Sequence, residues 1–249
     1  MDVYPENTMA NFKTKLPSRV ELTGRWEVGL VEIQYPHSWY NLSEVEELII
    51  TPAVSEEEGT PMASGEPYII RIPPGYYPTI TDLTKRIEEE IGRAMSWGKK
   101  RNKNIFDYDD ITRKVSVKLT KNPFPFSLTL SATIQRILGF ESNTLHVGTT
   151  EGVMGVDMDP LHSIYVYCDL VEKRVVGDKM VPLLRVIPAE GNHGEMVTRI
   201  YENVHYVPIQ LKSFEGVEID IRDNTGVSVP FERGTLNVTL HFRRRQRIL

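Results

Sequence analysis

Four arginines near the end of the sequence are the residues whose type and spacing could bind an anion: Arg243, Arg244, Arg245 and Arg247. The formal net charge of the whole chain is -5, so these residues form a local positive pole on an acidic protein. Guanidinium groups bind phosphates and carboxylates through paired hydrogen bonds. The cluster therefore predicts contact with nucleic acid or with an acidic neighbouring subunit, and a simple solubilising end is the alternative.

The four arginines directly follow Phe242, the last residue of a predicted strand. We expect them to leave the sheet together on one short segment. Exposed terminal charges contribute little to stability, so replacing all four by serine should leave the domain folded. A second basic run, at residues 99–103, is predicted to be a solvated loop.

Residue patterns that perform catalysis or hold a metal are missing from the sequence. The single cysteine, Cys168, lies in an apolar run and excludes zinc sites built on several thiolates. Asp157 and Asp159 match only half of a calcium loop and predict a turn. The six histidines are scattered without the spacing that metal ligation favours: His37, His146, His162, His193, His205 and His241. No nucleophile elbow, Walker loop or dinucleotide fingerprint occurs. We expect no catalytic residue, no metal, no cofactor and no enzymatic activity.

Composition is that of an ordinary globular protein, with 249 residues, 40% hydrophobic and 25% charged. A protein that grips nucleic acid over its whole surface would be basic, so any such contact must be local. One cysteine fits a reducing compartment. The sequence starts without a secretory signal and has no run of about 20 apolar residues. We therefore expect synthesis in the cytoplasm and no membrane contact.

The elements outside the middle of the chain are predicted to be strands. Residues 236–242 show the clearest alternation: Leu236, Val238, Leu240 and Phe242 point one way, and polar residues point the other. Similar runs occupy residues 26–34, 164–172, 181–187 and 195–201. About eight strands at this spacing predict one jelly-roll β-sandwich, because two jelly rolls need roughly twice as many.

The middle of the chain changes its period. Apolar residues recur every three or four positions from Ile80 to Ala94, and Thr79 with Asp82 resembles a capping box, which predicts a helix over residues 79–97. A short helix follows between Ser131 and Gly139. We expect a mainly β protein: a jelly roll of residues 1–75 and 157–249, interrupted by a small α+β insertion of residues 76–156.

Longer phrases of the sequence resemble one protein family. They are residues 4–12 (YPENTMANF), 26–41 (WEVGLVEIQYPHSWYN), 137–140 (ILGF), 181–185 (VPLLR), 205–208 (HYVP), 229–231 (VPF) and 240–245 (LHFRRR). Together they resemble the minor capsid protein, or penton, of Polinton (Maverick) virus-like elements. That family is related to the single jelly-roll pentons of virophages and adenoviruses.

The resemblance implies a viral structural protein that forms homo-pentamers at the icosahedral vertices of a virion, beside a double jelly-roll major capsid protein. It implies no catalytic residue, and it implies synthesis in the host cytoplasm, with nuclear assembly left open. Within a capsid the arginines would meet packaged DNA or neighbouring subunits. A host-domesticated β-sandwich binding module without capsid assembly is the alternative, and an enzyme comes third. Pentamers would favour the penton, and a monomer with a deep polar pocket would favour the binding module.

Overall fold

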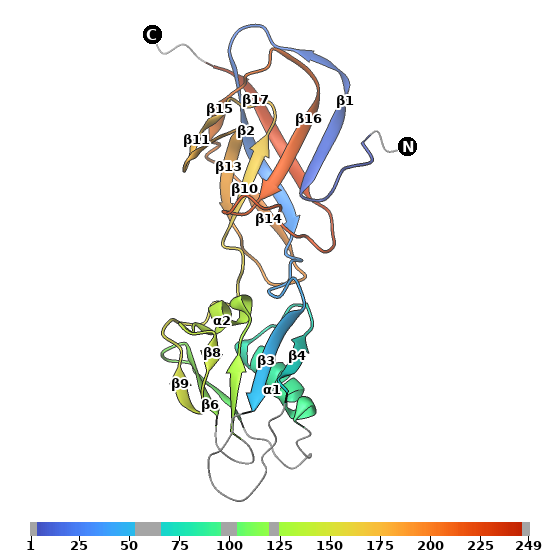
Figure 1. Cartoon of the computed structure of the whole chain (residues 1–249). Helices are drawn as coiled ribbons and strands as arrows, with labels where there is room; N and C mark the ends of the chain where they lie inside the picture. Colours follow the sequence, from blue (N-terminus) through green and yellow to red (C-terminus); the bar gives the residue numbers. More distant parts are fainter. Residues whose placement is uncertain (1–3, 53–65, 96–103, 120–124, 246–249) are drawn as a thin grey trace, which may run out of the picture. The chain divides into compact units, whose positions relative to one another are not determined.

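The computed structural model describes residues 4–52, 66–95, 104–119 and 125–245. The chain forms two compact units (Figure 1). One, here called the sandwich, combines Met1–Trp39 with Leu161–Leu249. The other, here called the insert, is Tyr40–Pro160. The chain therefore leaves the sandwich after β2 and returns to it before β10.

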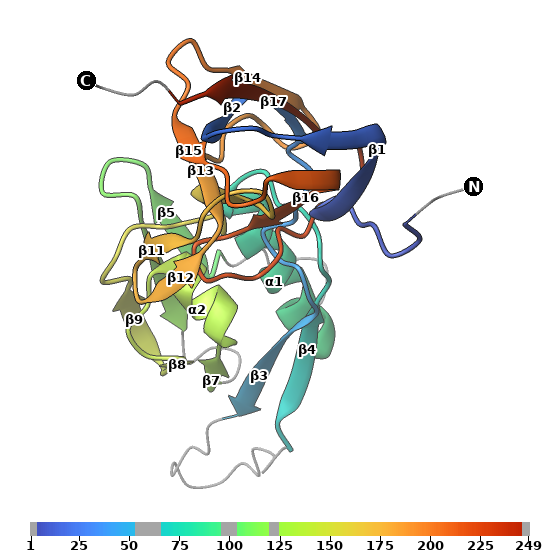
Figure 2. The same ribbon diagram turned by 90° about the horizontal axis from the view of Figure 1, so that it is seen from above.

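The first sheet of the sandwich has four antiparallel strands in the order β1-β16-β10-β13. These are β1 (Asn11–Glu21), β16 (Ser213–Arg222), β10 (Ser163–Cys168) and β13 (Leu183–Pro188). This sheet brings the two ends of the chain together: β1, near the start, pairs with β16, near the end (Figure 2). A hairpin of β11 (Arg174–Val176) and β12 (Lys179–Val181) joins β10 to β13.

The second sheet is built around β2 (Trp26–Pro36). Strands β14 (Met196–Ile200) and β15 (Tyr206–Pro208) pair with successive stretches of β2 along one edge. The last strand, β17 (Asn237–Arg244), pairs with β2 from Gln34 to Trp26 along the other edge. The two sheets thus contain eight strands among the described residues, which agrees with the predicted single jelly roll.

The core of the sandwich comes from side chains of both sheets. Buried residues of β2 such as Leu30 and Ile33 share one cluster with Ile164 and Val166 of β10. Phe214 of β16 stacks on Phe242 of β17 with 5.9 Å between ring centroids. The predicted alternation of the last strand is confirmed: Val238, Leu240 and Phe242 pack against this core.

The insert is an α+β unit with its own core. One sheet has the order β4-β3-β7-β8 and a second has the order β5-β6-β9. Its elements are β3 (Glu46–Pro52), β4 (Tyr68–Ile72), α1 (Ile80–Ala94), β5 (Phe106–Asp109), β6 (Lys114–Leu119), β7 (Phe126–Thr129), α2 (Ala132–Leu138), β8 (Thr144–Leu145) and β9 (Gly148–Glu151).

Both predicted helices are confirmed. In α1 the Thr79 hydroxyl accepts from the Asp82 amide at 3.1 Å, and the Asp82 carboxylate accepts from the Thr79 amide at 3.1 Å. Residues 96–103, where the helix was expected to end, lie outside the described residues. The short helix α2 ends at Gly139 with φ of 74°, the left-handed conformation that favours glycine.

One carboxylate attaches α1 to the chain entering β5. Glu88 Oε1 accepts hydrogen bonds from the Ile105 and Phe106 amides at 2.6 and 2.9 Å. Burial raises the pKa of Glu88 above its usual value, and the two amide donors oppose that rise. This half-buried side chain therefore satisfies two backbone donors that would otherwise lack a partner.

The insert is larger than the expected residues 76–156. Strands β3 and β4 pair with each other and β3 pairs with β7, so they belong to the insert and not to the jelly roll. Their inward side chains, Leu48, Ile50, Ile70 and Ile72, are buried in the same cluster as those of α1. At the other end, the Asp157 amide donates to the Ile137 carbonyl, which keeps this residue in the insert. Among the described residues, no helix is long and apolar enough to cross a membrane.

Candidate functional site

The sequence predicts that the arginines at the end of the chain leave the sheet together. This prediction is wrong, because two of them are still paired in the sheet. Arg243 and Arg244 are the last two residues of β17 and pair with Glu27 and Trp26 of β2. The strand pairing continues past Phe242 because β2 begins at Trp26, two residues before Val28, the partner of Phe242. Arg247 lies outside the described residues, and so does the basic run at 99–103.

Arg243 is held by neighbours in the sheet. Its Nε donates to Glu27 Oε1 at 2.6 Å, and its guanidinium lies 3.5 Å from the centroid of the Tyr206 ring. The Tyr206 hydroxyl in turn bonds with His241 Nδ1 at 2.8 Å. The Glu27 side chain is only 12% exposed, whereas that of Arg243 is 50% exposed. Arg243 therefore neutralises a buried carboxylate, which is a structural task.

Arg244 and Arg245 have looser surroundings. The Arg244 guanidinium donates to the Thr23 carbonyl at 3.3 Å. The Arg245 amide donates to the Arg25 carbonyl at 2.9 Å, and Arg245 lines a cavity of about 440 Å³. Two more cations, Arg25 and Lys212, line the same cavity. Sequence reasoning missed this group, because isolated cations far apart in the chain form no pattern.

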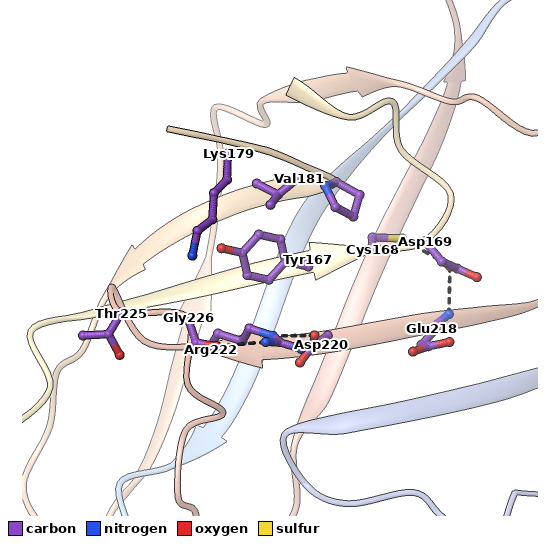
Figure 3. A pocket seen from close by; sticks show the side chains of 11 residues that line it. Tyr167, Cys168, Asp169, Lys179, Val181, Glu218, Asp220, Arg222, Thr225 and Gly226 are labelled. Atoms are coloured by element: carbon purple, nitrogen blue, oxygen red, sulfur yellow. Dashed lines mark hydrogen bonds and ion pairs between the residues drawn. The ribbon is translucent and has the colours of Figure 1, made fainter. Parts of the chain in front are cut away.

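A second cavity, of about 360 Å³, lies on the outer face of the first sheet (Figure 3). Strands β10 and β16 contribute its floor, β12 contributes Lys179 and Val181, and the turn after β16 contributes Thr225 and Gly226. This groove was not predicted, because its residues come from alternate positions of several strands. Outward-facing positions of that kind look like any solvated face in the sequence.

The polar side chains of the groove are partly occupied with each other. Arg222 donates to Asp220 at 2.7 Å and to the Gly226 carbonyl at 2.8 Å. Asp169 accepts from the Glu218 amide at 2.9 Å, and burial raises the pKa of its carboxyl. Burial likewise raises the pKa of Tyr167. The arrangement offers hydrogen bonds and charges of both signs to a ligand.

Cys168 also touches this groove, but its thiol is buried. Burial raises the pKa of the thiol to about 12, so the thiolate that would act as a nucleophile does not form near neutral pH. This agrees with the interpretation of Cys168 as inert packing.

Two of the scattered histidines meet in the sandwich. The His37 ring stacks on Trp39 at 4.0 Å between centroids, and the His193 ring lies 6.3 Å from that of His37. His193 Nδ1 also contacts the Trp39 carbonyl at 3.1 Å. Within the described ranges, no group of three histidine, cysteine or acidic side chains could hold a metal ion. The histidine pair is therefore best explained as packing around Trp39.

Comparison with known proteins bears on the fold. No protein-family model matches the sequence, and no curated protein matches it. Among solved structures, the crystal structure of the mavirus penton protein matches with a TM-score of 0.51 and 12% sequence identity. The match covers 94% of this chain and 90% of that chain. This chain shares its fold with the mavirus penton protein. The predicted jelly roll and the resemblance to pentons thus agree with the structure at the level of fold.

Proposed function

We propose that this protein is a penton, a minor capsid protein that forms homo-pentamers at the icosahedral vertices of a Polinton/Maverick-type virion. The observation that carries the proposal is the shared fold with the mavirus penton protein along nearly the whole of both chains. A double jelly-roll major capsid protein is the proposed neighbour. The proposed role is structural and not enzymatic, with synthesis in the host cytoplasm and a final location at the capsid vertex.

Exposed apolar side chains on the sandwich support self-association. Val175 and Met180 face each other across the β11–β12 hairpin and are 72% and 59% exposed. On β14, Met196 and Ile200 are 51% and 69% exposed. A closed ring of identical subunits needs two different patches, each meeting the other on the next subunit. The hairpin and β14 lie on different sheets and can serve as such a pair.

The arginine end of β17 is proposed to face the particle interior or the junction between subunits. This role requires the other three arginines, Arg244, Arg245 and Arg247, since Arg243 is already bound to Glu27. Packaged DNA and acidic neighbouring subunits both suit guanidinium groups.

Light scattering on the purified protein tests the proposal. We expect a mass of five times 28.5 kDa, for the protein alone or after it is mixed with the major capsid protein of the same element. In the mixture, electron microscopy should show fivefold vertices. Replacing Val175 and Met180 by glutamate should weaken the association of the subunits into a ring. Ile111→Glu is the matched control, because Ile111 is 93% exposed but lies in the insert. A protein that stays monomeric in the mixture and produces no vertices contradicts the penton role.

A binding module without capsid assembly is the second candidate. The groove on the outer face of β10 and β16 favours it, because cavities with a few convergent polar groups are the usual ligand sites. A monomer that binds a sugar or peptide, and loses that binding when Asp220 and Arg222 are replaced by alanine, would support this alternative.

A further inference from the structure

One end of the sandwich carries a cavity of about 440 Å³ that is rimmed by three cations, Arg25, Lys212 and Arg245, and is here called the basic pocket. Its walls come from four separate segments: the turn between β1 and β2, the loop after β10, the segment between β15 and β16, and the end of β17.

Backbone hydrogen bonds connect these segments. The Leu22 amide donates to the Lys212 carbonyl at 2.7 Å, and the Arg245 amide donates to the Arg25 carbonyl at 2.9 Å. The Ile209 amide donates to the Trp26 carbonyl at 2.9 Å. The main chain at each of the three cations is therefore fixed relative to the others, although the segments are distant in sequence.

The three cations have no carboxylate within 4.0 Å among the residues that the structure describes. Other arginines of the same sandwich do have one, in the pairs Arg19 with Glu215, Arg199 with Glu190, Arg222 with Asp220 and Arg243 with Glu27. Glu172 is the single acidic residue of the lining, so the pocket residues carry a net charge of about +2. Three unpaired cations around one cavity attract an anion.

The remaining walls indicate the kind of anion. Leu22, Trp26, Ile209, Leu211 and Pro208 present apolar surface beside the cations. A nucleic-acid strand needs a basic groove that follows several phosphates along its backbone. A compact cavity that combines three cations with a smaller share of apolar surface instead suits a carboxylate that is accompanied by an apolar side chain.

We propose that the basic pocket binds an acidic segment of a partner protein. A carboxylate of that segment meets Arg25, Lys212 and Arg245, and an adjacent apolar side chain packs against Leu22 and Ile209. The inference rests on the penton role proposed above and deepens it, because it names the chemistry of the neighbouring protein that Arg245 would meet. Peptide binding by a single subunit does not require a pentamer, so a failure of this inference is distinguishable from a failure of the penton role.

Fluorescence anisotropy with the full chain at low salt tests the proposal directly. The probe is a fluorescein-labelled peptide of four Asp-Leu repeats, and the comparison probes are a peptide of eight aspartates and a single-stranded oligonucleotide of 20 nucleotides. We expect the Asp-Leu peptide to bind most tightly. Replacing Arg25, Lys212 and Arg245 together by glutamine should weaken its binding at least about tenfold, since several charge-assisted contacts are lost.

A matched control removes the same charge elsewhere. Arg71, Lys85 and Lys118 are basic residues of the insert, which contributes no residue to the lining of the pocket. Their replacement by glutamine should leave peptide binding within about twofold, because exposed charges outside the pocket are screened. Equal binding by the two triple variants overturns the proposal. Tighter binding of the oligonucleotide, lost in the pocket variant, also overturns it in favour of a nucleic-acid site. Equally tight binding of the eight-aspartate peptide overturns it as well, because the apolar side chain would then contribute nothing to recognition.

Discussion

Replacing Arg243 by serine should destabilise the sandwich, whereas the same change at Arg244 should not. The Glu27 carboxylate receives its hydrogen bond from Arg243 at 2.6 Å and is 12% exposed, so loss of the arginine leaves a buried charge without its cation. A hydrogen bond to a charged group contributes about 1.5–3 kcal/mol, and the lower end applies because Arg243 is half exposed. Contact with the Tyr206 ring adds about 0.5–1 kcal/mol.

We therefore expect Arg243→Ser to lower the free energy of unfolding by about 2–2.5 kcal/mol. Arg244 donates only to exposed Thr23 at 3.3 and 3.4 Å, so Arg244→Ser should change it by less than about 0.5 kcal/mol. Urea denaturation of the purified protein, followed by circular dichroism, measures both values.

A double-mutant cycle with Glu27→Gln isolates the interaction between Arg243 and Glu27. The coupling free energy should be about 1–2 kcal/mol, because the two residues are in direct contact. Equal stabilities of the two serine variants, or a coupling near zero, would refute the reasoning that Arg243 is structural.

The remaining predictions concern three buried or half-buried residues: Glu88, Cys168 and Gly29. Glu88→Ala should lower the stability of the insert by about 2 kcal/mol, by leaving two amides without an acceptor, whereas Glu88→Gln should keep it. The raised pKa of Glu88 means that the folded state binds more protons than the unfolded state between the usual glutamate pKa and the raised one. The stability of the protein should therefore fall as pH rises through this range. Thermal melts of Glu88→Gln should lack this pH dependence. Cys168 should resist iodoacetamide at pH 8 in the native protein and react in urea, as mass spectrometry would show. Gly29→Ala should cost about 1–3 kcal/mol in urea denaturation, because the added Cβ would collide with Val204 and lie 2.9 Å from the His205 carbonyl oxygen.

The elements that could be predicted from the sequence are those whose information is local. Helix α1 shows a 3.6-residue period and a capping box within one stretch of chain, so its start at Ile80 follows from neighbouring residues. The alternation in β17 likewise identifies which side chains face the core. These patterns depend only on the geometry of a single element.

The domain boundary could not be predicted in the same way. Alternation in β3 and β4 shows that one face of each strand is buried, but it does not tell which sheet the strand joins. Strand β7, which pairs with β3, begins at Phe126, more than 70 residues after Pro52 at the end of β3. The pairing of β3 and β4 with the insert therefore depends on contacts that no local period encodes.

The end of the β17 ladder explains why adjacent arginines have different surroundings. The pairing partner β2 begins at Trp26, just after a turn that contains Gly24 with φ of 91°. Arg243 and Arg244 lie opposite Glu27 and Trp26, the first two residues of β2, while the Arg245 amide makes one last backbone hydrogen bond to Arg25 of the turn. Arg245 itself lines the cavity. The position of that turn, which cannot be read from a run of arginines, thus separates a structural arginine from one available to a partner.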